Sequence, residues 1–244
     1  AIRVFIEDEH FTTYHFANED AEGNVVKKPI LWPVLAGDGV EVTRQYPMEE
    51  TPHEEDRDHP HHKSLWTAYG DVNGADLWAE GGGSGVQYVD NVAFGSGDAY
   101  GWIVSENIWK DAEGTPVIDE TREYRFYYGP DQMRLLNATI TFTASYGEVT
   151  FGDTKEGGIM AMRVAYPLRA DQQGTMTTSE GAVVSGRAPE RLIWGKEASW
   201  LDYSGPIGDG TYGIAIFDHP THPRHPTRWH ARKYGLVGAT IFGL

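Results

Sequence analysis

The sequence predicts an all-β protein, an antiparallel β-sandwich of many strands, and three observations support this. Several segments alternate between polar and apolar residues or are rich in β-branched and aromatic residues, as strands are. No long stretch has the i, i+3, i+4, i+7 apolar spacing of an amphipathic helix. In addition, 29 glycines and 13 prolines among 244 residues interrupt every candidate helix.

The expected strands are spread along the whole chain. The clearest is "LNATITFTA" (136–144), whose apolar residues share one face while its Asn and Thr residues share the other. We therefore expect a half-buried strand with one wet or ligand-facing side. Four further strands are expected at "IRVFI" (2–6), "EYRFYY" (123–128), "IMAMRVAY" (159–166) and "YGIAIF" (212–217).

The length of 244 residues suits one large β domain or two ordinary ones. No linker, low-complexity tract or repeat of fixed period divides the chain, so we expect a single domain over residues 1–244. The chain starts at Ala1 rather than Met and stops at Leu244, on the apolar run "YGLVGATIFGL". We therefore expect the natural protein to have a further C-terminal strand or tail, and the start leaves room for a cleaved upstream segment.

The charge balance and the cysteine count exclude several classes of protein. With 36 acidic and 20 basic residues the formal net charge is −16, which disfavours nucleic acid and anionic membranes as partners. No run approaches the ~20 apolar residues of a membrane span, so we expect a soluble protein. The absence of cysteine excludes disulfides and thiolate metal sites. It also leaves the compartment open, either cytoplasmic or, after processing, secreted or periplasmic.

Three segments combine residue types that perform acid/base chemistry or bind hydroxyl groups. The first is "DHPHHKSLWTAYGDVNGADLW" (58–78), which holds three His, two Trp and three Asp residues. Imidazole changes charge near neutral pH, so His61 and His62 are candidate catalytic residues. Trp rings stack on flat ligands, and Asp and Asn bind hydroxyl groups, so the candidate substrate contacts are Trp66, Asp71, Asn73, Asp76 and Trp78. The alternatives are an ordinary polar loop and, for the tryptophans, the protein core.

The second segment is "FGDTKEGG" (151–158), which places charged residues beside two glycines. If it is extended, Asp153 and Lys155 share a face and Glu156 points the other way, unless the strand bulges. We predict that Glu156 is a general base, because the glycines let the backbone approach a ligand and the charged neighbours tune its pKa. Asp153 and Lys155 are candidate substrate contacts. The alternative is a β-turn with a surface ion pair.

The third segment is "DHPTHPRHPTRWHARKYG" (218–235), whose three prolines exclude a helix and favour a stiff, extended loop. His230 is a further candidate acid or base. Arg suits carboxylates and sugar hydroxyls, and Trp offers a flat stacking surface. The candidate substrate contacts are His219, Arg224, His225 and Trp229. The alternative is a loop whose His and Arg residues offset an acidic surface.

Seven of the ten histidines lie in two short segments, 59–62 and 219–230. Because titratable groups cluster at functional sites, we expect a shared site. His59, His61 and His62 with a carboxylate also fit a divalent metal such as Zn, Mn or Fe, which is an alternative without a firm ligand assignment. No HExxH, EF-hand, GxSxG or GxxxxGK[ST] motif is present, and no GxGxxG lies between a strand and a helix.

Together, the three segments resemble a bacterial family of unknown function that is often labelled methane oxygenase PmoA-like. The similarity extends from "KPILWPV" (28–34) to "YGLVGATIFG" (234–243). It implies a β-supersandwich similar to that of galactose mutarotase, whose relatives bind sugars on a concave sheet face. In the mutarotases a His is the general acid and a Glu the general base at the anomeric centre. The mutarotase motifs themselves are not matched here residue by residue.

From these residues and this resemblance we expect a carbohydrate-active enzyme, such as a glycoside hydrolase, a lyase or a mutarotase-like enzyme. It would use general acid/base chemistry on a small-molecule or oligosaccharide substrate, with His61, His62 or His230 as acid and Glu156 as base. The alternatives are a non-catalytic carbohydrate-binding protein and a metal-dependent oxidoreductase or lyase. We further expect the three segments to line one pocket, and at least one of their tryptophans to stack on a sugar ring.

Overall fold

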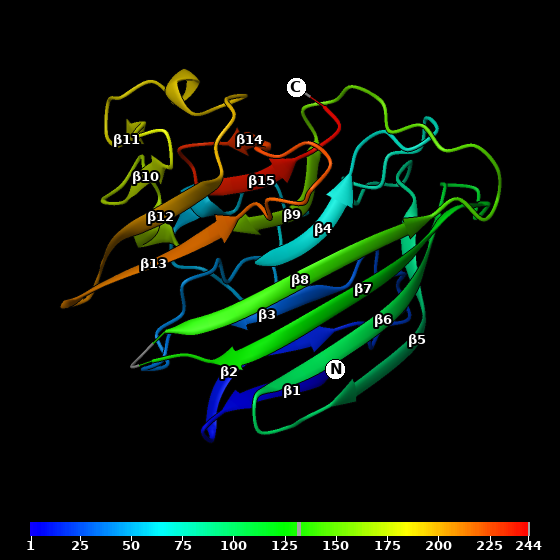
Figure 1. The fold of residues 1–244 in the computed structure, drawn as a ribbon, viewed down its shortest axis with the longest axis horizontal. Coiled ribbons are helices and arrows are strands. Elements are labelled where there is room, and N and C mark those ends of the chain that lie inside the picture. Colours follow the sequence, from blue (N-terminus) through cyan, green and yellow to red (C-terminus); the bar gives the residue numbers. More distant parts are fainter. Residues whose placement is uncertain (131–132, 244) are drawn as a thin grey trace. The chain divides into compact units, whose positions relative to one another are not determined.

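The structure of the protein is a computed structural model that describes residues 1–130 and 133–243. The described residues form fifteen strands and three short 3-10 helices, η1 (Glu54–Asp56), η2 (Tyr166–Leu168) and η3 (Glu190–Leu192) (Figure 1). The strands pair antiparallel along every register that the structure defines, which confirms the predicted all-β, antiparallel fold. In this part of the chain, no helix is both long and apolar enough to cross a membrane.

The chain divides into two compact units, each assembled from two separate segments. The first unit comprises Ala1–Val40 and Tyr69–Gly152, and the second comprises Glu41–Ala68 and Asp153–Leu244. The chain therefore passes from one unit to the other three times, and no single cut in the sequence separates them. The expectation of a single domain stays a prediction.

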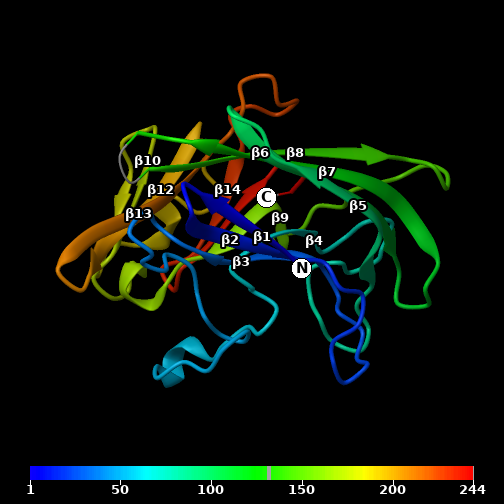
Figure 2. The same ribbon diagram turned by 90° about the horizontal axis from the view of Figure 1, so that it is seen from below.

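The first unit is a sandwich of antiparallel strands. Its strands are β1 (Ile2–Ile6), β2 (Glu9–His15), β3 (Ile30–Val34), β5 (Val86–Gly95), β6 (Tyr100–Lys110), β7 (Pro116–Tyr128) and β8 (Arg134–Thr143). Strands β1, β2 and β3 pair in that order, and β5 to β8 form a meander that curves visibly in Figure 2. Aromatic rings pack between the two layers, with centroids 6.0 Å apart for Phe11 and Phe126 and 5.7 Å apart for Tyr14 and Tyr124.

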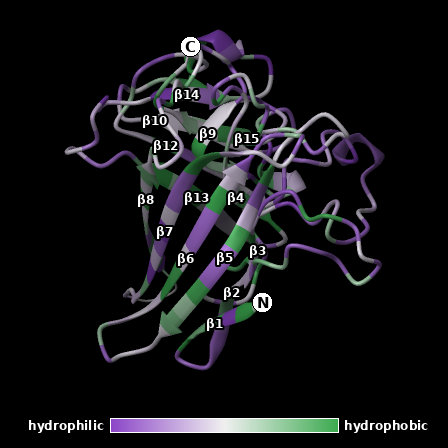
Figure 3. Cartoon of the chain, turned by 90° about the vertical axis from the view of Figure 1, so that its right-hand side faces the viewer, coloured by the Kyte–Doolittle hydropathy of each residue, from purple (hydrophilic) through white to green (hydrophobic). Residues whose placement is uncertain are grey.

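Strand β8 illustrates how side-chain alternation builds this unit. From Arg134 to Thr143 its residues are alternately half-buried and exposed, as the pattern of "LNATITFTA" predicts. On the inner side, Phe142 meets the edge of the buried Trp109 ring at a centroid distance of 5.2 Å. Figure 3 shows the same alternation of hydrophilic and hydrophobic residues along β5 and β6. The period of two therefore decides which side chains enter the core.

A buried ion pair lies at the centre of the first unit. The side chains of Glu120 and Arg122 on β7 are fully buried, and Arg122 Nε lies 2.6 Å from Glu120 Oε1. Trp109 on β6 donates its indole N–H to Glu120 (2.6 Å), and Arg122 donates to Gln87 on β5 (3.0 Å). A buried charge without a partner is energetically costly. A shift in the register of β5, β6 or β7 would break these bonds, so they favour the observed register.

The second unit also has two antiparallel layers. Its strands are β4 (Leu65–Tyr69), β9 (Gly157–Arg163), β10 (Thr175–Thr178), β11 (Val183–Val184), β12 (Trp200–Ile207), β13 (Gly210–Phe217), β14 (Arg228–Ala231) and β15 (Leu236–Thr240). One layer has the order β4-β9-β15-β14 and the other the order β11-β10-β12-β13. The layers are joined by hydrogen bonds from the Tyr203 hydroxyl to the Arg232 carbonyl and from the Trp229 indole to the Ala198 carbonyl (2.9 Å).

The five predicted strands coincide with strands of the structure. Four lie at β1, β7, β8 and β13, almost within the observed bounds. The fifth, predicted at 159–166, overlaps β9 but runs past its end at Arg163, because Tyr166 and Pro167 begin the 3-10 helix η2. Proline lacks the N–H that a strand would need and fits the first turn of a helix.

We expect Arg122→Met to lower the free energy of unfolding by about 3–5 kcal/mol, because it leaves the Glu120 carboxylate buried without its cation. The matched control is Arg125→Met on the same strand, which removes an ion pair to Glu123 of the same 2.6 Å length whose arginine is partly exposed. That control should cost about 0–1 kcal/mol. Urea denaturation measures the free energy of unfolding of both variants. Equal losses would contradict the expectation that the buried ion pair contributes more to stability than the exposed one.

Candidate functional site

Three arginines surround two aspartates in the second unit, and this arginine cluster is the basis of the candidate site. Arg163 Nη2 lies 2.7 Å from an oxygen of Asp58 and 3.3 Å from one of Asp56. Arg169 Nη1 lies 3.2 Å from Asp56. Arg44 lies 3.4 Å from Asp58 and 3.7 Å from Asp56. All three arginine side chains are buried or nearly so, so the aspartates supply the negative charge that their burial requires.

Arg44 also fixes the shape of the loop that carries the aspartates. Its guanidinium group donates to the backbone carbonyls of Asp56 and Asp58, and to that of His59 at 3.3 Å. Burial and the like charge of Arg163 lower the pKa of Arg44 to about 10, and the aspartates partly offset this. Arg44 therefore stays charged at neutral pH and can hold the loop in one conformation.

The two aspartates respond differently to their surroundings. Burial is the largest influence on each and by itself raises the pKa of a carboxyl group. For Asp58, Arg163, the hydrogen bond from His59 and Arg44 together outweigh burial, and its pKa is lowered. For Asp56 the arginines only partly offset burial, and its pKa is raised. Asp58 is the carboxylate whose negative charge is better stabilised.

Asp58 orients the neighbouring imidazole of His59. His59 Nδ1–H donates to Asp58 Oδ2 at 2.7 Å, while 44% of the His59 side chain is exposed. The backbone of His59 is left-handed, with φ of +41°. Such a conformation is costly for a residue other than glycine and is found where the surroundings enforce it, often at functional sites. Because Nδ1 is bound, the Nε2 atom of His59 is the one available to a ligand.

Flat rings are stacked beside His59. The ring centroid of His59 lies 4.9 Å from that of His62 and 5.2 Å from that of Tyr234, with interplanar angles of 1° and 9°. His62 in turn stacks on the buried Trp66 at 5.6 Å. The Arg163 guanidinium lies 4.5 Å from the centre of the Tyr234 ring. Stacking and cation–π contact thus connect the arginine cluster to the exposed imidazole.

The Tyr234 hydroxyl is near enough to the predicted residue Glu156 to be influenced by its charge. Burial raises the pKa of Tyr234 to about 12, with the charges of Asp58 and Glu156 adding to the rise and those of Arg163 and Arg232 opposing it. Glu156 therefore lies within electrostatic reach of Tyr234. Its own carboxylate is part-exposed and lies 3.5 Å from Lys155 Nζ, so the surface ion pair weighed from the sequence is present.

His230 lies close to the same group, in surroundings that disfavour its protonated form. It is buried on β14, and burial, followed by the charges of Arg232, Lys155 and His59, lowers its pKa to about 3. At neutral pH it is neutral and has no extra proton to give. The sequence pattern did not indicate how deeply β14 is buried, and the catalytic role of His230 stays a prediction.

His62 also has a different role from the predicted catalytic one. Its side chain is buried, and Arg163 Nη1–H donates to His62 Nδ1 at 3.3 Å. Since arginine only donates, the Nδ1 atom of His62 carries no proton. His62 is a packing residue between Trp66 and His59. His61 is half-buried, its ring lies 5.8 Å from that of His59, and its catalytic role stays a prediction.

The three tryptophans of the predicted sugar contacts are core residues. The exposed fractions are 0% for Trp66, 2% for Trp78 and 0% for Trp229, so no ring face is available for stacking on a sugar. The expectation that at least one would stack on a ligand is therefore corrected. A large aromatic side chain gains most by burial, which is the alternative that the sequence left open.

The predicted contacts of the first unit close turns. Asp71 accepts the Gly74 N–H at 2.9 Å, and Asp76 accepts the backbone N–H groups of Trp78 and Ala79 at 2.9 and 3.0 Å. Asn73 bonds the backbone of Glu148 and Thr150 at 2.9 and 2.7 Å. Asp and Asn favour such side-chain-to-backbone bonds in turns, so these residues are explained by local structure.

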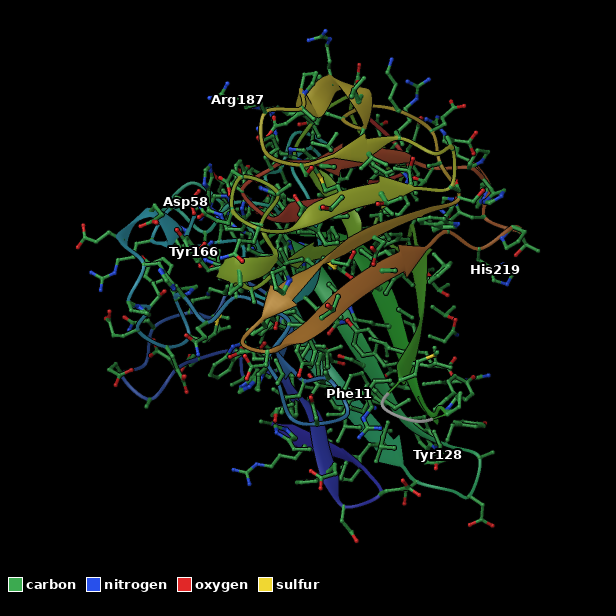
Figure 4. All side chains as sticks on the ribbon, turned by 90° about the vertical axis from the view of Figure 1, so that its left-hand side faces the viewer. Phe11, Asp58, Tyr128, Tyr166, Arg187 and His219 are labelled. Carbon is green, nitrogen blue, oxygen red and sulfur yellow. The ribbon has the colours of Figure 1, made fainter. Side chains whose placement is uncertain are left out.

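The proline-rich loop 218–227 is organised around its own aspartate. Asp218 accepts the His225 ring N–H at 2.9 Å and the Thr227 N–H at 2.8 Å. His219 contacts Thr221 of the same loop, and Arg224 is exposed. Figure 4 shows His219 and Asp58 on opposite sides of the second unit. His219 is therefore not part of the group around His59, and the role of the loop as a substrate contact stays a prediction.

Among the described residues, no group of three or more His, Asp or Glu side chains is placed to hold a metal ion. His59 and Asp58, which the metal alternative would use together, are bonded to each other. Asp153 is exposed on the segment that leads into β9, and its role as a substrate contact stays a prediction.

The sequence reasoning missed the residues that organise the site. One local signal was available, because Asp58 directly precedes His59. The arginines gave none, since Arg44 is far in the sequence from Arg163 and Arg169, and the cluster forms only in the fold.

We expect stability below pH 6.5 to fall more steeply for the wild-type protein than for His230→Gln. The pKa of His230 is 6.5 when unfolded and about 3 when folded, so between these values only the unfolded chain binds the proton. Stability present above pH 6.5 is thus lost as the pH falls, by about 1.4 kcal/mol per pH unit. Urea denaturation at pH 7, 6 and 5 measures the slopes. His219→Gln is the exposed control, and parallel slopes for all three proteins would contradict the assignment.

Comparison with known proteins gives a family but no function. A model of DUF6807, a family of unknown function, matches residues 1–242. No curated protein and no solved structure matches the chain. The family match includes both units and every residue of the arginine cluster. The chain therefore belongs to the DUF6807 family of unknown function.

Proposed function

We propose that the protein is a carbohydrate-active enzyme in which His59 transfers protons and Asp58 orients it. The observation that carries the proposal is an exposed imidazole whose Nδ1 is bound to a carboxylate that Arg163 in turn holds at 2.7 Å. A base positioned by a fixed third group is the arrangement of many acid/base catalysts. The left-handed backbone of His59 supports a functional reason for the arrangement, because it stores strain at this residue.

The groups around His59 support a hydroxyl-rich substrate. The Tyr234 ring lies 5.2 Å away and the His61 ring 5.8 Å away. The charge of Lys155 contributes to the lowered pKa of His230, and the charge of Glu156 contributes to the raised pKa of Tyr234. Lys155 and Glu156 therefore lie near the rings that surround His59. Phenol, imidazole, ammonium and carboxylate groups together donate and accept the hydrogen bonds that sugar hydroxyls need.

The division of roles follows from these positions. Glu156 accepts a proton when it is ionised, and a protonated His59 is then the complementary acid at the glycosidic or anomeric oxygen. The resemblance to methane oxygenase PmoA-like proteins, and through them to galactose mutarotase, supports the same reaction class by analogy. The proposal differs from the sequence-based one in naming His59 in place of His62 and His230.

We expect His59→Gln to lower kcat by about 10²–10⁴-fold with little change in substrate binding, because it removes the proton-transferring group. A panel of aryl glycosides and free sugars, assayed for release and for anomerisation, first identifies the turnover. His219→Gln in the proline-rich loop is the control. A His59→Gln enzyme that keeps more than about a third of the wild-type kcat would remove His59 from the mechanism. Binding of sugars with no turnover across the panel would favour the non-catalytic alternative.

A second experiment tests whether Asp58 orients His59 or only contributes an ion pair to the structure. Asp58→Asn should lower kcat by at least about 10²-fold, and the double variant with His59→Gln should be no worse than either single variant, because the two residues act as one unit. The matched control is Asp171→Asn, since Asp171 is equally exposed (32% against 33%) and also lies 2.7 Å from an arginine, Arg169. Equal effects of the two aspartate substitutions would mean that Asp58 has only a structural role.

A further inference from the structure

The outer side of the β11-β10-β12-β13 layer carries an unusual set of side chains. Along β12, Leu201 and Tyr203 are fully buried, so Trp200, Asp202 and Ser204 point to the opposite side, where each is only half-buried. Figure 4 views this side of the second unit, with β12 and β13 toward the viewer. None of these three residues belongs to the site around His59.

The neighbouring strand β13 adds one aromatic residue at the end of this side and small residues at its middle. In the antiparallel register, Phe217 stands opposite Trp200 and Ala215 opposite Asp202, followed by Gly213 along the same side. The ring centroids of Trp200 and Phe217 lie 6.3 Å apart with an interplanar angle of 45°, and Phe217 is 72% exposed. Small residues, Ala215 and Gly213, therefore follow the aromatic pair on the same side as the Asp202 carboxylate.

Asp202 is in an unfavourable position for an aspartate. Aspartate is depleted from strands, and this one is half-buried in the middle of β12. Burial raises the pKa of Asp202, and a hydrogen bond with the Ser204 side chain partly offsets this rise. A Cβ at Gly213 would lie 2.9 Å from the Tyr203 carbonyl, 3.0 Å from Ser204 Cβ and 3.3 Å from Asp202 Oδ1, so β12 packs closely here and no side chain covers this side of the carboxylate. A carboxylate held without a cation is stabilised by hydrogen-bond donors from a ligand.

We propose that this face is a second carbohydrate-binding surface, with a sugar ring stacked on Phe217 and Trp200 and its hydroxyls donating to Asp202. The sugar class rests on the proposed function, whereas the surface itself is distinct from the candidate catalytic group. It would hold one part of a longer carbohydrate chain.

A sugar fits this surface better than other ligands because it combines two features. Its ring presents an apolar C–H face to aromatic side chains, and its rim presents several hydroxyl donors to a carboxylate. Trp200 and Asp202 point the same way two residues apart, roughly 7 Å along a strand, so stacking and hydrogen bonding can engage the same or adjoining rings. An anionic ligand is disfavoured by Asp202 and by the net charge of −16.

Native affinity electrophoresis tests the proposal. The gels contain hydroxyethyl cellulose or galactomannan, and at least one of these neutral polysaccharides should retard the wild-type protein. Polygalacturonate is the anionic control that should not retard it, and retardation by polygalacturonate alone would overturn the proposal. Phe217→Ala should raise the dissociation constant by roughly 2- to 12-fold, the range expected for one aromatic contact. Asp202→Asn should raise it by roughly tenfold or more, since it replaces charged hydrogen bonds by neutral ones.

Two control variants separate this proposal from the catalytic one. Phe94→Ala on β5 removes a similarly exposed phenylalanine, 64% against 72%, and should leave retardation unchanged. His59→Gln should keep the retardation and lose only turnover, while Phe217→Ala should keep turnover of small glycosides. Absence of retardation in all gels, equal retardation of Phe217→Ala and wild type, or binding to poly-lysine in place of polysaccharide would each overturn the second surface.

Discussion

Arg163 is the side chain on which the arrangement of the second unit's candidate site depends. It stands at the end of β9, and its guanidinium group contacts Asp56, Asp58, His62 and the face of Tyr234. Its backbone N–H donates to the Ser64 carbonyl at 2.7 Å, and its own carbonyl accepts the Arg44 N–H at 2.9 Å. A buried guanidinium group has to satisfy its donors inside the protein. That requirement determines where the surrounding loop can lie.

The exposed His59 is a consequence of this buried charge. Its position follows from Asp58, whose second oxygen is taken by Arg163, and from a backbone that Arg44 holds through three carbonyls. A catalytic group on a loop is usually less precise than one on a strand. Here the loop is bonded to buried arginines from other segments, so an exposed residue gains the rigidity of the core.

Much of the fold followed from the sequence, because strand alternation is a local property. The strands at 2–6 and 136–144 could be placed from period and residue type alone. Burial depth could not. "SLWTAY" was interpreted as ligand-binding because it contains Trp and polar residues, yet β4 is buried along its whole length. Whether a tryptophan is exposed to solvent depends on which layer covers it, and the covering layer comes from segments far away in the sequence.

The site was predicted only where its residues are neighbours in sequence. The histidines of segment 58–62 indicate a candidate site, but His59, to which we assign proton transfer, differs from its neighbours in backbone conformation and in its carboxylate partner. Arg44 and Arg163 come from the two separate segments of the second unit. Long-range charge pairing of this kind leaves no periodic mark on a sequence, and so composition and spacing cannot reveal it.

The interleaved order of the two units has a consequence for synthesis on the ribosome. All of the first unit, through Gly152, leaves the ribosome before most of the second unit does. The segment Glu41–Ala68 has by then emerged, with Asp56 and Asp58, but Arg163 and Arg169 have not. Until they do, Arg44 is the one arginine of the cluster that can pair with Asp56 and Asp58, so the burial of the two carboxylates cannot be completed. Maturation of the candidate site is thereby the late event in the life of the nascent chain.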